Sequence, residues 1–278
     1  NLGRITSAYT YVSGGSTVAQ FDYTYDPNTN SITQQEYDHR DGDPVSAFTY
    51  DKLRRLTDVD YGIDDTAESF DLDKLGNRDD VDTRYAGQVD YGIDDLTNRY
   101  DTVGGNALTY DAAGNLTTDR QGYTYGYDYE NRIVKITAGQ TDIAEYSYDA
   151  LGRRVEKKDC VTSTNTRRYY YDKDWRVVND YDGSNNPTRQ YLWGNYIDEV
   201  LFSWGTALTP PSMRFYAHDH LYSPVALLSA ASAVIERYEY DAYGEPNILD
   251  GSYNPRSPQA SSYDNTYLFT GRQVDSLD

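Results

Sequence analysis

The sequence has a single cysteine, Cys160, and no long apolar run. One cysteine cannot form an intrachain disulfide, so a small disulfide-stapled scaffold is excluded. No histidine lies near Cys160 in the sequence, and we interpret it as an ordinary packed or edge residue instead of a catalytic thiol. The longest apolar stretch, residues 224–235, is shorter than the roughly 20 residues that cross a bilayer, so no membrane insertion is expected.

Positive charge is also scarce. Only 25 Lys and Arg stand against 45 Asp and Glu, giving a formal net charge of −20. Basic runs do not exceed pairs such as Lys157-Lys158 and Arg167-Arg168. Nucleic-acid binding depends on a basic patch that neutralises phosphates, so the sequence predicts no nucleic-acid partner. The acidic balance disfavours anionic membranes and favours a highly soluble protein.

Tyrosine is abundant instead, with 31 residues against 6 Phe and 3 Trp. A tyrosine ring gains from burial, whereas its hydroxyl needs water or a hydrogen-bond partner. A core built on tyrosine therefore suits sheets whose faces are only partly dry. We do not expect one close-packed interior.

Tyr-Asp followed by a short turn recurs along the chain, as in residues 48–55, 108–115 and 146–153. Each copy has the pattern of an aromatic strand end, an Asp, a turn and a second strand. One Asp per copy gives spacings from 17 (128 − 111) to 25 residues (51 − 26); the marks are Asp26, Asp51, Asp73, Asp94, Asp111, Asp128, Asp149 and Asp172. Such a period indicates a repeat array whose units bury their faces against neighbours. We predict an all-β fold of antiparallel hairpin repeats.

The Asp at each turn has a mechanical role in this interpretation. Its carboxylate accepts backbone N–H groups two or three residues further on, and a following Gly takes positive φ without steric cost. Arg or Asn after the Gly restarts the second strand. Period-two alternation predicts that residues 144–149 pair with residues 153–157. The predicted structural turn residues are Asp51, Asp111, Gly114, Asp149, Gly152, Asp241 and Gly244.

The repeat register also suggests how the chain is organised. Residues 1–182 form the repeat array, and residues 183–278 form a continuous segment in which the register loosens and which is truncated at its C-terminal end. Residues 61–65 and 91–95 both read Tyr-Gly-Ile-Asp-Asp, which indicates duplication. Residues 206–213 and 247–265 are rich in turn-forming residues and are expected to be loops.

Longer segments then occur in a fixed order: residues 148–154, 191–194, 216–224, 234–244 and 269–272. With the Tyr-Asp repeats, they resemble the YD repeats and the repeat-associated core of the RHS family. That family is found in bacterial secreted and surface proteins, insecticidal toxin complexes and animal teneurins. The resemblance covers essentially the whole chain.

The resemblance implies a long antiparallel sheet that winds in a spiral and forms part of a hollow, cocoon-like shell wall. In several relatives the shell encloses a C-terminal toxin, which is released by self-cleavage at an aspartate-containing site after the core. This sequence departs from the family pattern, because the segment leading to an Asp-Pro cleavage motif is missing after residue 272. No protease residue or toxin is therefore carried over. Tyr222 stands where the family usually has Gly, which leaves room for a different local turn.

Metal binding is the first alternative to a purely structural role. His218 and His220 are weak candidate ligands, since residues two apart in a strand share a face about 6.6 Å apart. The one other histidine is His39, so a place in the wall is favoured. Acidic runs at residues 58–60, 71–73 and 79–82 invite calcium, but none has the ligand pattern of an EF-hand loop. A strand places alternate Asp residues on one solvent face. No cofactor is predicted, with weak calcium binding left open.

Catalysis and sugar binding are two further roles to weigh against a structural one. With 45 acidic residues, carboxylate pairs arise by chance, so a glycosidase is not indicated. Phosphate-loop, dinucleotide and nucleophile-elbow motifs are absent. Rows of Tyr could stack sugars, but cross-strand ladders that support the sheet are favoured.

The sequence therefore predicts a non-enzymatic structural repeat protein, secreted or displayed on a bacterial surface, that encloses, displays or adheres. Its expected partners are further repeats or domains of its own longer chain. Two alternatives stay open. One is the encapsulating shell of a toxin whose cargo lies downstream of residue 278. The second is a carbohydrate- or cell-surface-binding module that uses tyrosine-rich sheet faces.

Overall fold

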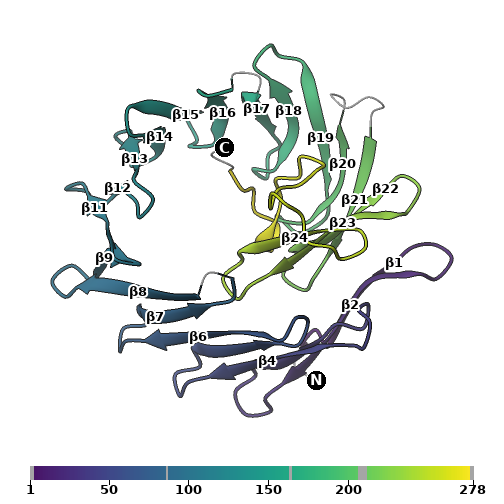
Figure 1. Cartoon of the computed structure of the whole chain (residues 1–278). Coiled ribbons are helices and arrows are strands. Elements are labelled where there is room, and N and C mark those ends of the chain that lie inside the picture. The colour runs from purple at the N-terminus through teal and green to yellow at the C-terminus, as the bar shows by residue number, and fades with distance from the viewer. Residues whose placement is uncertain (1–2, 86, 163–164, 206–211, 276–278) are drawn as a thin grey trace. The chain divides into compact units, whose positions relative to one another are not determined.

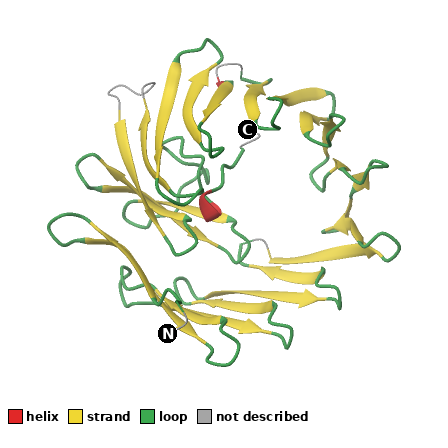
Figure 2. Cartoon of the chain, turned by 180° about the vertical axis from the view of Figure 1, so that it is seen from behind, coloured by secondary structure: helices red, strands yellow, loops and turns green. Residues whose placement is uncertain are grey.

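The computed structural model describes residues 3–85, 87–162, 165–205 and 212–275. Almost all regular structure in these ranges is β-strand, and they contain no α-helix (Figure 2). A short 3₁₀ turn spans Phe269–Gly271. The predicted all-β fold is confirmed.

The described chain divides into two compact units. The first unit takes residues 3–88, 192–203 and 212–275, and the second takes residues 89–191 with a short piece that follows residue 203. Strands β8, β19 and β20 contain the points where the chain passes from one unit to the other. The division of the sequence at residue 182 remains a prediction.

The first unit is built from two groups of strands, one near each end of the chain (Figure 1). The strands are β1 (Ser7–Tyr11), β2 (Thr17–Tyr25), β3 (Ile32–Glu36), β4 (Val45–Tyr50), β5 (Leu56–Tyr61), β6 (Thr66–Leu72), β7 (Arg78–Thr83), β21 (Ser212–His218), β22 (Pro224–Ser229), β23 (Val234–Tyr240) and β24 (Pro246–Asp250).

The middle of the chain supplies the second unit and the strands that lead into and out of it. These strands are β8 (Gly87–Asp94), β9 (Arg99–Val103), β10 (Asn106–Ala107), β11 (Thr109–Tyr110), β12 (Leu116–Thr118), β13 (Tyr123–Tyr127), β14 (Ile133–Ala138), β15 (Thr141–Tyr148), β16 (Arg154–Asp159), β17 (Arg167–Tyr171), β18 (Val177–Asp182), β19 (Pro187–Trp193) and β20 (Val200–Gly205).

Within each unit, strands that follow one another in sequence pair antiparallel, except β10 and β11, which belong to different sheets. β15 pairs with β16 through Tyr146↔Lys157 and Ser147↔Glu156, so the predicted pairing of residues 144–149 with residues 153–157 is confirmed. The register slips by one residue at the tyrosine that precedes the bend, for example between Ser147 and Tyr148. The same slip occurs at Tyr25 and Tyr50. Such bulges increase the local right-handed twist of the strands.

The core of the first unit lies where β2 meets β21 and β22. Phe21 and Tyr23 point to the same face of β2 because they are two residues apart, and both are buried. They pack with buried residues of the C-terminal strands, including Ala217 and Val225. Segments about 200 residues apart in sequence thereby share one apolar core.

The second unit has a thinner core. Its cluster contains the buried residues Ile136, Ala144 and Tyr146, surrounded by partly buried tyrosine and isoleucine side chains. This is the partly dry, tyrosine-lined packing that the composition leads us to expect.

The acidic runs follow the strand pattern. In β5, Asp58 and Asp60 are exposed, whereas Val59 and Tyr61 between and after them are buried. In β7, Val81 is buried between less buried aspartates. The alternation of strand residues therefore accounts for the placement of the aspartates in β5 and β7.

The predicted C-terminal loop begins later than expected. Residues 247–250 belong to β24, which pairs with β23 through Glu239↔Asn247 and Arg237↔Leu249. Pairing with a neighbouring strand overrode the turn-rich local composition, and the loop starts only after Asp250. In the other predicted loop, residues 206–211 lie outside the described residues, and Ser212 and Met213 belong to β21.

The duplicated Tyr-Gly-Ile-Asp-Asp segments have different structures. In the first copy, β5 ends at Tyr61 and pairs with Thr66, so residues 62–65 form the bend. In the second copy, the residues up to Asp94 continue β8, and Asp94 pairs with Arg99. The bend moves because the residues after the second copy supply a new Asp-initiated turn, closed by a hydrogen bond from Asn98 N to Asp94 O of 2.8 Å.

In most Asp-initiated bends the fourth residue has positive φ, whereas in the bends at Asp26 and Asp94 it is the fifth, Asn30 and Asn98. Gly152 adopts φ +83°. Arg54, Trp175 and Tyr222 occupy the same position with φ between 63° and 66°. The bend that contains Tyr222 keeps the common geometry, and the Tyr222 ring stacks on Tyr196 with centroids 4.3 Å apart. Tyrosine in place of glycine therefore does not change this turn.

We predict that Gly152→Val lowers the free energy of unfolding by about 1–3 kcal/mol, because a β-branched residue is strained at positive φ. Urea denaturation of the variant and the parent measures the difference. The matched control is Gly126→Val in β13, where an added Cβ would lie 3.6 Å from Lys135 Cβ, an ordinary contact. Valine favours strands, so the control should lose no stability. Equal unfolding midpoints for Gly152→Val and the parent would contradict the turn model.

Candidate functional site

The most repeated site in the molecule is the bend that starts at an aspartate. Asp149 Oδ1 accepts the backbone N–H groups of Leu151 and Arg153, each at 2.9 Å. Asp149 Oδ2 accepts a hydrogen bond from Arg153 Nε at 2.7 Å. Desolvation raises the pKa of this carboxyl, but the backbone N–H and guanidinium of Arg153 outweigh it, so the pKa lies below its ordinary value.

This geometry differs in one respect from the sequence expectation. The first carboxylate oxygen accepts the backbone N–H groups of the residues two and four positions further on. The side chain of the residue four positions on, which is the fifth residue of the bend, also donates to the second oxygen. The sequence led us to expect that this Arg or Asn only restarts the strand. Its regular Asp-x-x-x-Arg/Asn spacing was the signal for the side-chain pairing. The other bends with this pairing start at Asp51, Asp73, Asp111, Asp128, Asp172, Asp182 and Asp250.

The tyrosine before the aspartate joins one hairpin to the preceding one. Tyr148 Oη donates to Ile133 O at 2.7 Å, and Ile133 begins the second strand of the preceding hairpin. A Phe at this position would lack the hydroxyl and leave that contact unmade. The same bond is made by Tyr25, Tyr50, Tyr110, Tyr127, Tyr171 and Tyr240.

The arginine of one bend connects the aspartate of that bend to the tyrosine of the next hairpin. The guanidinium carbon of Arg132, which is paired with Asp128, lies 4.8 Å from the centroid of the Tyr148 ring in the next hairpin. Arg153 lies over Tyr171 in the same way, at 5.2 Å. A cation over an aromatic face is attractive. We call this arrangement of bend carboxylate, arginine and following tyrosine the Asp–Arg–Tyr tie.

The last of the predicted bends, Asp241–Gly244, is a point of close packing in the first unit. Asp241 Oδ1 accepts the N–H groups of Tyr243 and Glu245, both at 2.8 Å. A Cβ added at Gly244 would lie 2.4 Å from Phe269 Cδ1, so only glycine fits there. Ala242 N donates to Glu68 Oε2 at 3.1 Å. This bend connects β6 to the C-terminal segment.

Glu68 and Glu236 hold neighbouring segments of the first unit together, and the sequence did not predict this role. Both are buried, with exposed fractions of 3% and 0%. Glu68 also accepts a hydrogen bond from Tyr61 Oη. Glu236 forms an ion pair with Arg256 at 2.9 Å and accepts the Ser262 N–H at 2.9 Å. In a strand pattern such residues read as solvent-facing, so only tertiary contacts identify them.

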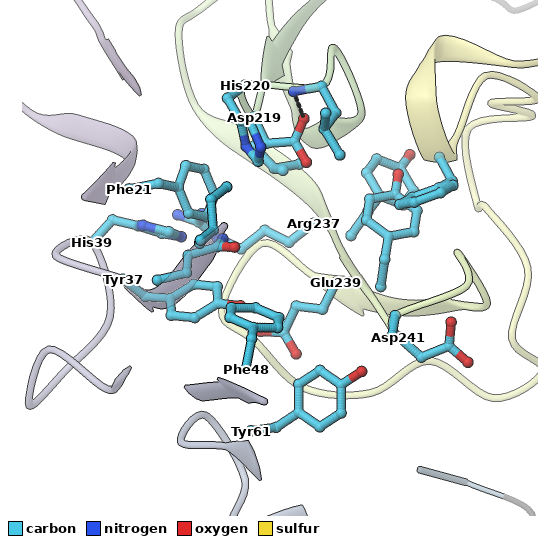
Figure 3. Close-up of a pocket in the computed structure, with 18 of the residues that line it drawn as sticks. Phe21, Tyr37, His39, Phe48, Tyr61, Asp219, His220, Arg237, Glu239 and Asp241 are labelled. Atoms are coloured by element: carbon cyan, nitrogen blue, oxygen red, sulfur yellow. Dashed lines mark hydrogen bonds between the residues drawn. The ribbon is translucent and has the colours of Figure 1, made fainter. Parts of the chain in front are cut away.

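A cavity of about 240 Å³ is lined by residues of the first unit (Figure 3). β2, β4 and β5 contribute the rings of Phe21, Phe48 and Tyr61 to its wall. The bend after β21 contributes Asp219. β23 and its bend contribute Arg237, Glu239 and Asp241.

Two of the charged groups in the cavity wall, Glu239 and Arg237, are held by neighbouring groups. Glu239 forms an ion pair with Arg40 at 2.6 Å. Arg237 donates to Val18 O at 2.9 Å, and its guanidinium carbon lies 4.1 Å from the Tyr253 ring centroid. Arg40 lies 4.2 Å from the same ring. Burial lowers the pKa of Arg237, since desolvation disfavours its charged form.

His218 and His220 do not occupy one strand. His218 is the last residue of β21, and His220 lies in the bend that follows, so the strand spacing assumed for two metal ligands does not apply. The His220 ring lies 4.3 Å from that of Tyr23. Burial lowers the pKa of His218 to about 4 and also lowers that of His220. No group of three or more His, Cys, Asp or Glu in the described part of the chain is arranged to hold a metal.

The chain resembles several known proteins. A family model described as the teneurin YD-shell matches residues 2–255. The chain is 28% identical over 232 residues to the tRNA3(Ser)-specific nuclease WapA of Bacillus spizizenii, which covers 81% of this chain and 9% of that protein. It is 28% identical over 187 residues to the toxin protein Tse5 of Pseudomonas aeruginosa, which covers 56% of this chain and 14% of that protein. The chain thus spans a small part of the length of these relatives.

The fold also matches a solved structure. The crystal structure of TcdB2-TccC3 superposes with a TM-score of 0.76 over 99% of this chain and 16% of that chain. The sequences are 15% identical, so the likeness concerns the fold alone.

We predict that Tyr148→Phe lowers the free energy of unfolding by about 0.5–1.5 kcal/mol, the usual net contribution of one hydrogen bond. The ring stays in place and only the bond to Ile133 O is lost. Tyr170→Phe is the control, because Tyr170 is 53% exposed. Chemical denaturation should show a larger loss of stability for Tyr148→Phe than for Tyr170→Phe. An equal loss in both variants would show that the Tyr148 hydroxyl does not stabilise the contact between hairpins.

We predict that Asp149→Asn lowers the thermal unfolding midpoint at pH 7, because the ion pair with Arg153 is lost. The native pKa is depressed, so the carboxylate stabilises the fold above the ordinary value of 3.8 and loses this effect as pH falls through the lower native value. The variant and the parent should therefore converge in acid.

Thermal melts from pH 7 to pH 2.5 test this, with Asp142→Asn as the control. Asp142 pairs with Lys135 at 2.7 Å at the surface, and exposed pairs contribute little. A constant gap between Asp149→Asn and the parent at all pH values would contradict an ionic contribution.

Proposed function

Because the chain belongs to the teneurin YD-shell family, which bears out the RHS resemblance, we propose that it forms part of a toxin-enclosing shell. Its action is mechanical, since the sheet is the working part and no catalytic step is assigned to it. The cargo is another segment of the same longer chain.

The observation that carries this proposal is the repeated Asp–Arg–Tyr tie. In the bend at Asp149 the carboxylate uses both oxygens within its own turn, and the hydroxyl of Tyr148 donates its hydrogen to the preceding hairpin. These groups reinforce a sheet and are not directed at a substrate. An extended, reinforced sheet suits a wall.

The names of the relatives support the choice of cargo. One is a tRNA nuclease and another is a toxin, and the chain matches 9% and 14% of their lengths. We assign the toxic activity to other parts of such proteins and the enclosing role to the matched part. A secreted bacterial origin is consistent with this assignment. No helix in the described ranges is long and apolar enough to span a membrane.

The glycan-binding alternative gains no support. Tyrosine hydroxyls that would contact sugars donate instead to backbone carbonyls within the sheet, as Tyr127 does to Leu116 O at 2.7 Å. The rows of tyrosine therefore act as the cross-strand supports that the sequence favours.

Limited proteolysis of the full product of the parent gene tests the enclosing role. We expect the polypeptide outside residues 1–278 to resist protease in the native protein. In a variant with Asp149→Ala and Asp172→Ala, which removes two ties, the same polypeptide should become sensitive. Asp142→Asn serves as the matched control and should keep the protection. Equal cleavage in the parent and the double variant, or a parent gene that encodes no further polypeptide, would overturn the proposal.

A further inference from the structure

Asp219 and Asp241 line the cavity in the first unit, and among the described residues neither carboxylate forms an ion pair. Asp219 Oδ1 accepts the N–H groups of Leu221 and Ser223 at 2.8 and 2.9 Å. Desolvation raises the pKa of Asp219 to about 6, so at pH 7.5 the cavity wall carries a carboxylate without a countercharge.

The cavity around this carboxylate is walled by aromatic rings. The charge of Asp219 raises the pKa of Tyr240 and adds to the rise for Tyr37, after the larger effect of burial in both cases. Both tyrosines line the cavity together with Phe21, Phe48 and Phe269. Ring faces carry negative electrostatic potential, so aromatic walls beside a carboxylate favour a cation.

Arg237 in the cavity wall, and Arg40 next to the lining residue Glu239, are bound to groups other than Asp219. Arg40 is paired with Glu239, and Arg237 is held by Val18 O, Gly251 O and the Tyr253 ring. Asp219 is not among the charges that shift the pKa of Arg237, whereas Glu239 and Arg40 are. These two arginines therefore have other partners and do not neutralise the charge of Asp219.

A second polar group of the cavity, next to Asp219 in the sequence, is unpaired. His220 lines the cavity, and its Nδ1 is buried without a hydrogen-bond partner. Burial favours the neutral imidazole, which offers one nitrogen as an acceptor. A ligand that donates hydrogen bonds or carries positive charge would satisfy both His220 and Asp219.

We propose that this cavity binds a small organic ammonium ion, held by Asp219 and by the surrounding aromatic rings. The volume of about 240 Å³ is sufficient, since an engineered cavity of about 150 Å³ accommodates benzene. The net charge of −20 further favours cations near the protein. This site is independent of the proposed enclosing role.

Titration of the 278-residue chain with choline at pH 7.5, followed by calorimetry and by saturation-transfer NMR, tests the proposal. We expect saturable binding of choline. Its uncharged isostere 3,3-dimethyl-1-butanol should bind at least tenfold more weakly. Equal binding of the two probes, or no binding of any ammonium probe, would overturn the proposal.

Two variants assign the binding to the cavity. Asp219→Asn keeps an oxygen for the bend N–H groups but removes the charge, and it should weaken choline binding at least tenfold. Phe48→Leu keeps apolar volume but removes a ring, and it should weaken binding several-fold even if Asp219→Asn does not fold. Asp142→Asn should bind like the parent. Unchanged binding in a folded Asp219→Asn or in Phe48→Leu would rule out this cavity as the site.

A third probe separates two sources of the ammonium group. N-acetyl-lysine methylamide presents the primary ammonium of a protein side chain, whereas choline represents a free quaternary amine. Tighter binding of the lysine derivative would assign the cavity to a peptide side chain. Tighter binding of choline would assign it to a small molecule. Both results support an ammonium site, and both must disappear in Asp219→Asn.

Discussion

The carboxylate of the bend aspartate is the group on which the rest of the structure depends. One oxygen organises the turn through two backbone N–H groups, and the other fixes the side chain four residues later. In the bends at Asp128 and Asp149 that side chain is an arginine, and it lies over the tyrosine of the next hairpin. The hydroxyl of this tyrosine then binds the backbone of the hairpin before it. One acidic side chain thereby fixes the shape of its bend. Through the arginine and the tyrosine it also fixes the spacing between neighbouring hairpins.

This role changes the meaning of the acidic composition. A net charge of −20 suggests a surface made for solubility. Many of the aspartates, however, act as acceptors inside the fold, and their pKa values are lowered by the groups that they hold, as at Asp51 and Asp111. In both bends the residue four positions on is the leading cause of the shift. The aspartates that begin the repeated bends therefore account for part of the negative charge of the protein.

The sequence reveals the parts of this structure that depend on local pattern. Strand pairing around Tyr148 and the position of the bends follow from alternation and turn chemistry over a few residues. The pairing of the aspartate with the fifth residue also recurs locally, but it concerns two side chains, and strand periodicity carries no information about it. The two copies of Tyr-Gly-Ile-Asp-Asp show the limit of local reading, because identical residues form a bend in one place and a strand in another.

Tertiary contacts were beyond the reach of the sequence. Nothing in the pattern of β2 indicates that Phe21 meets β21 and β22, because strand alternation shows which face is apolar but not which strands cover it. Glu68 and Glu236 look like surface residues until their partners are known. The candidate cavity is formed by residues from both groups, so it could not be predicted before their association was seen.

The Tyr148 hydroxyl bond reaches only the adjacent hairpin, and this has a consequence for the history of the chain. A module that depends on its immediate neighbour alone can be copied or deleted without disturbing distant ones. Copy number can then drift between lineages while each junction keeps the same chemistry. Selection on overall length becomes separable from selection on stability.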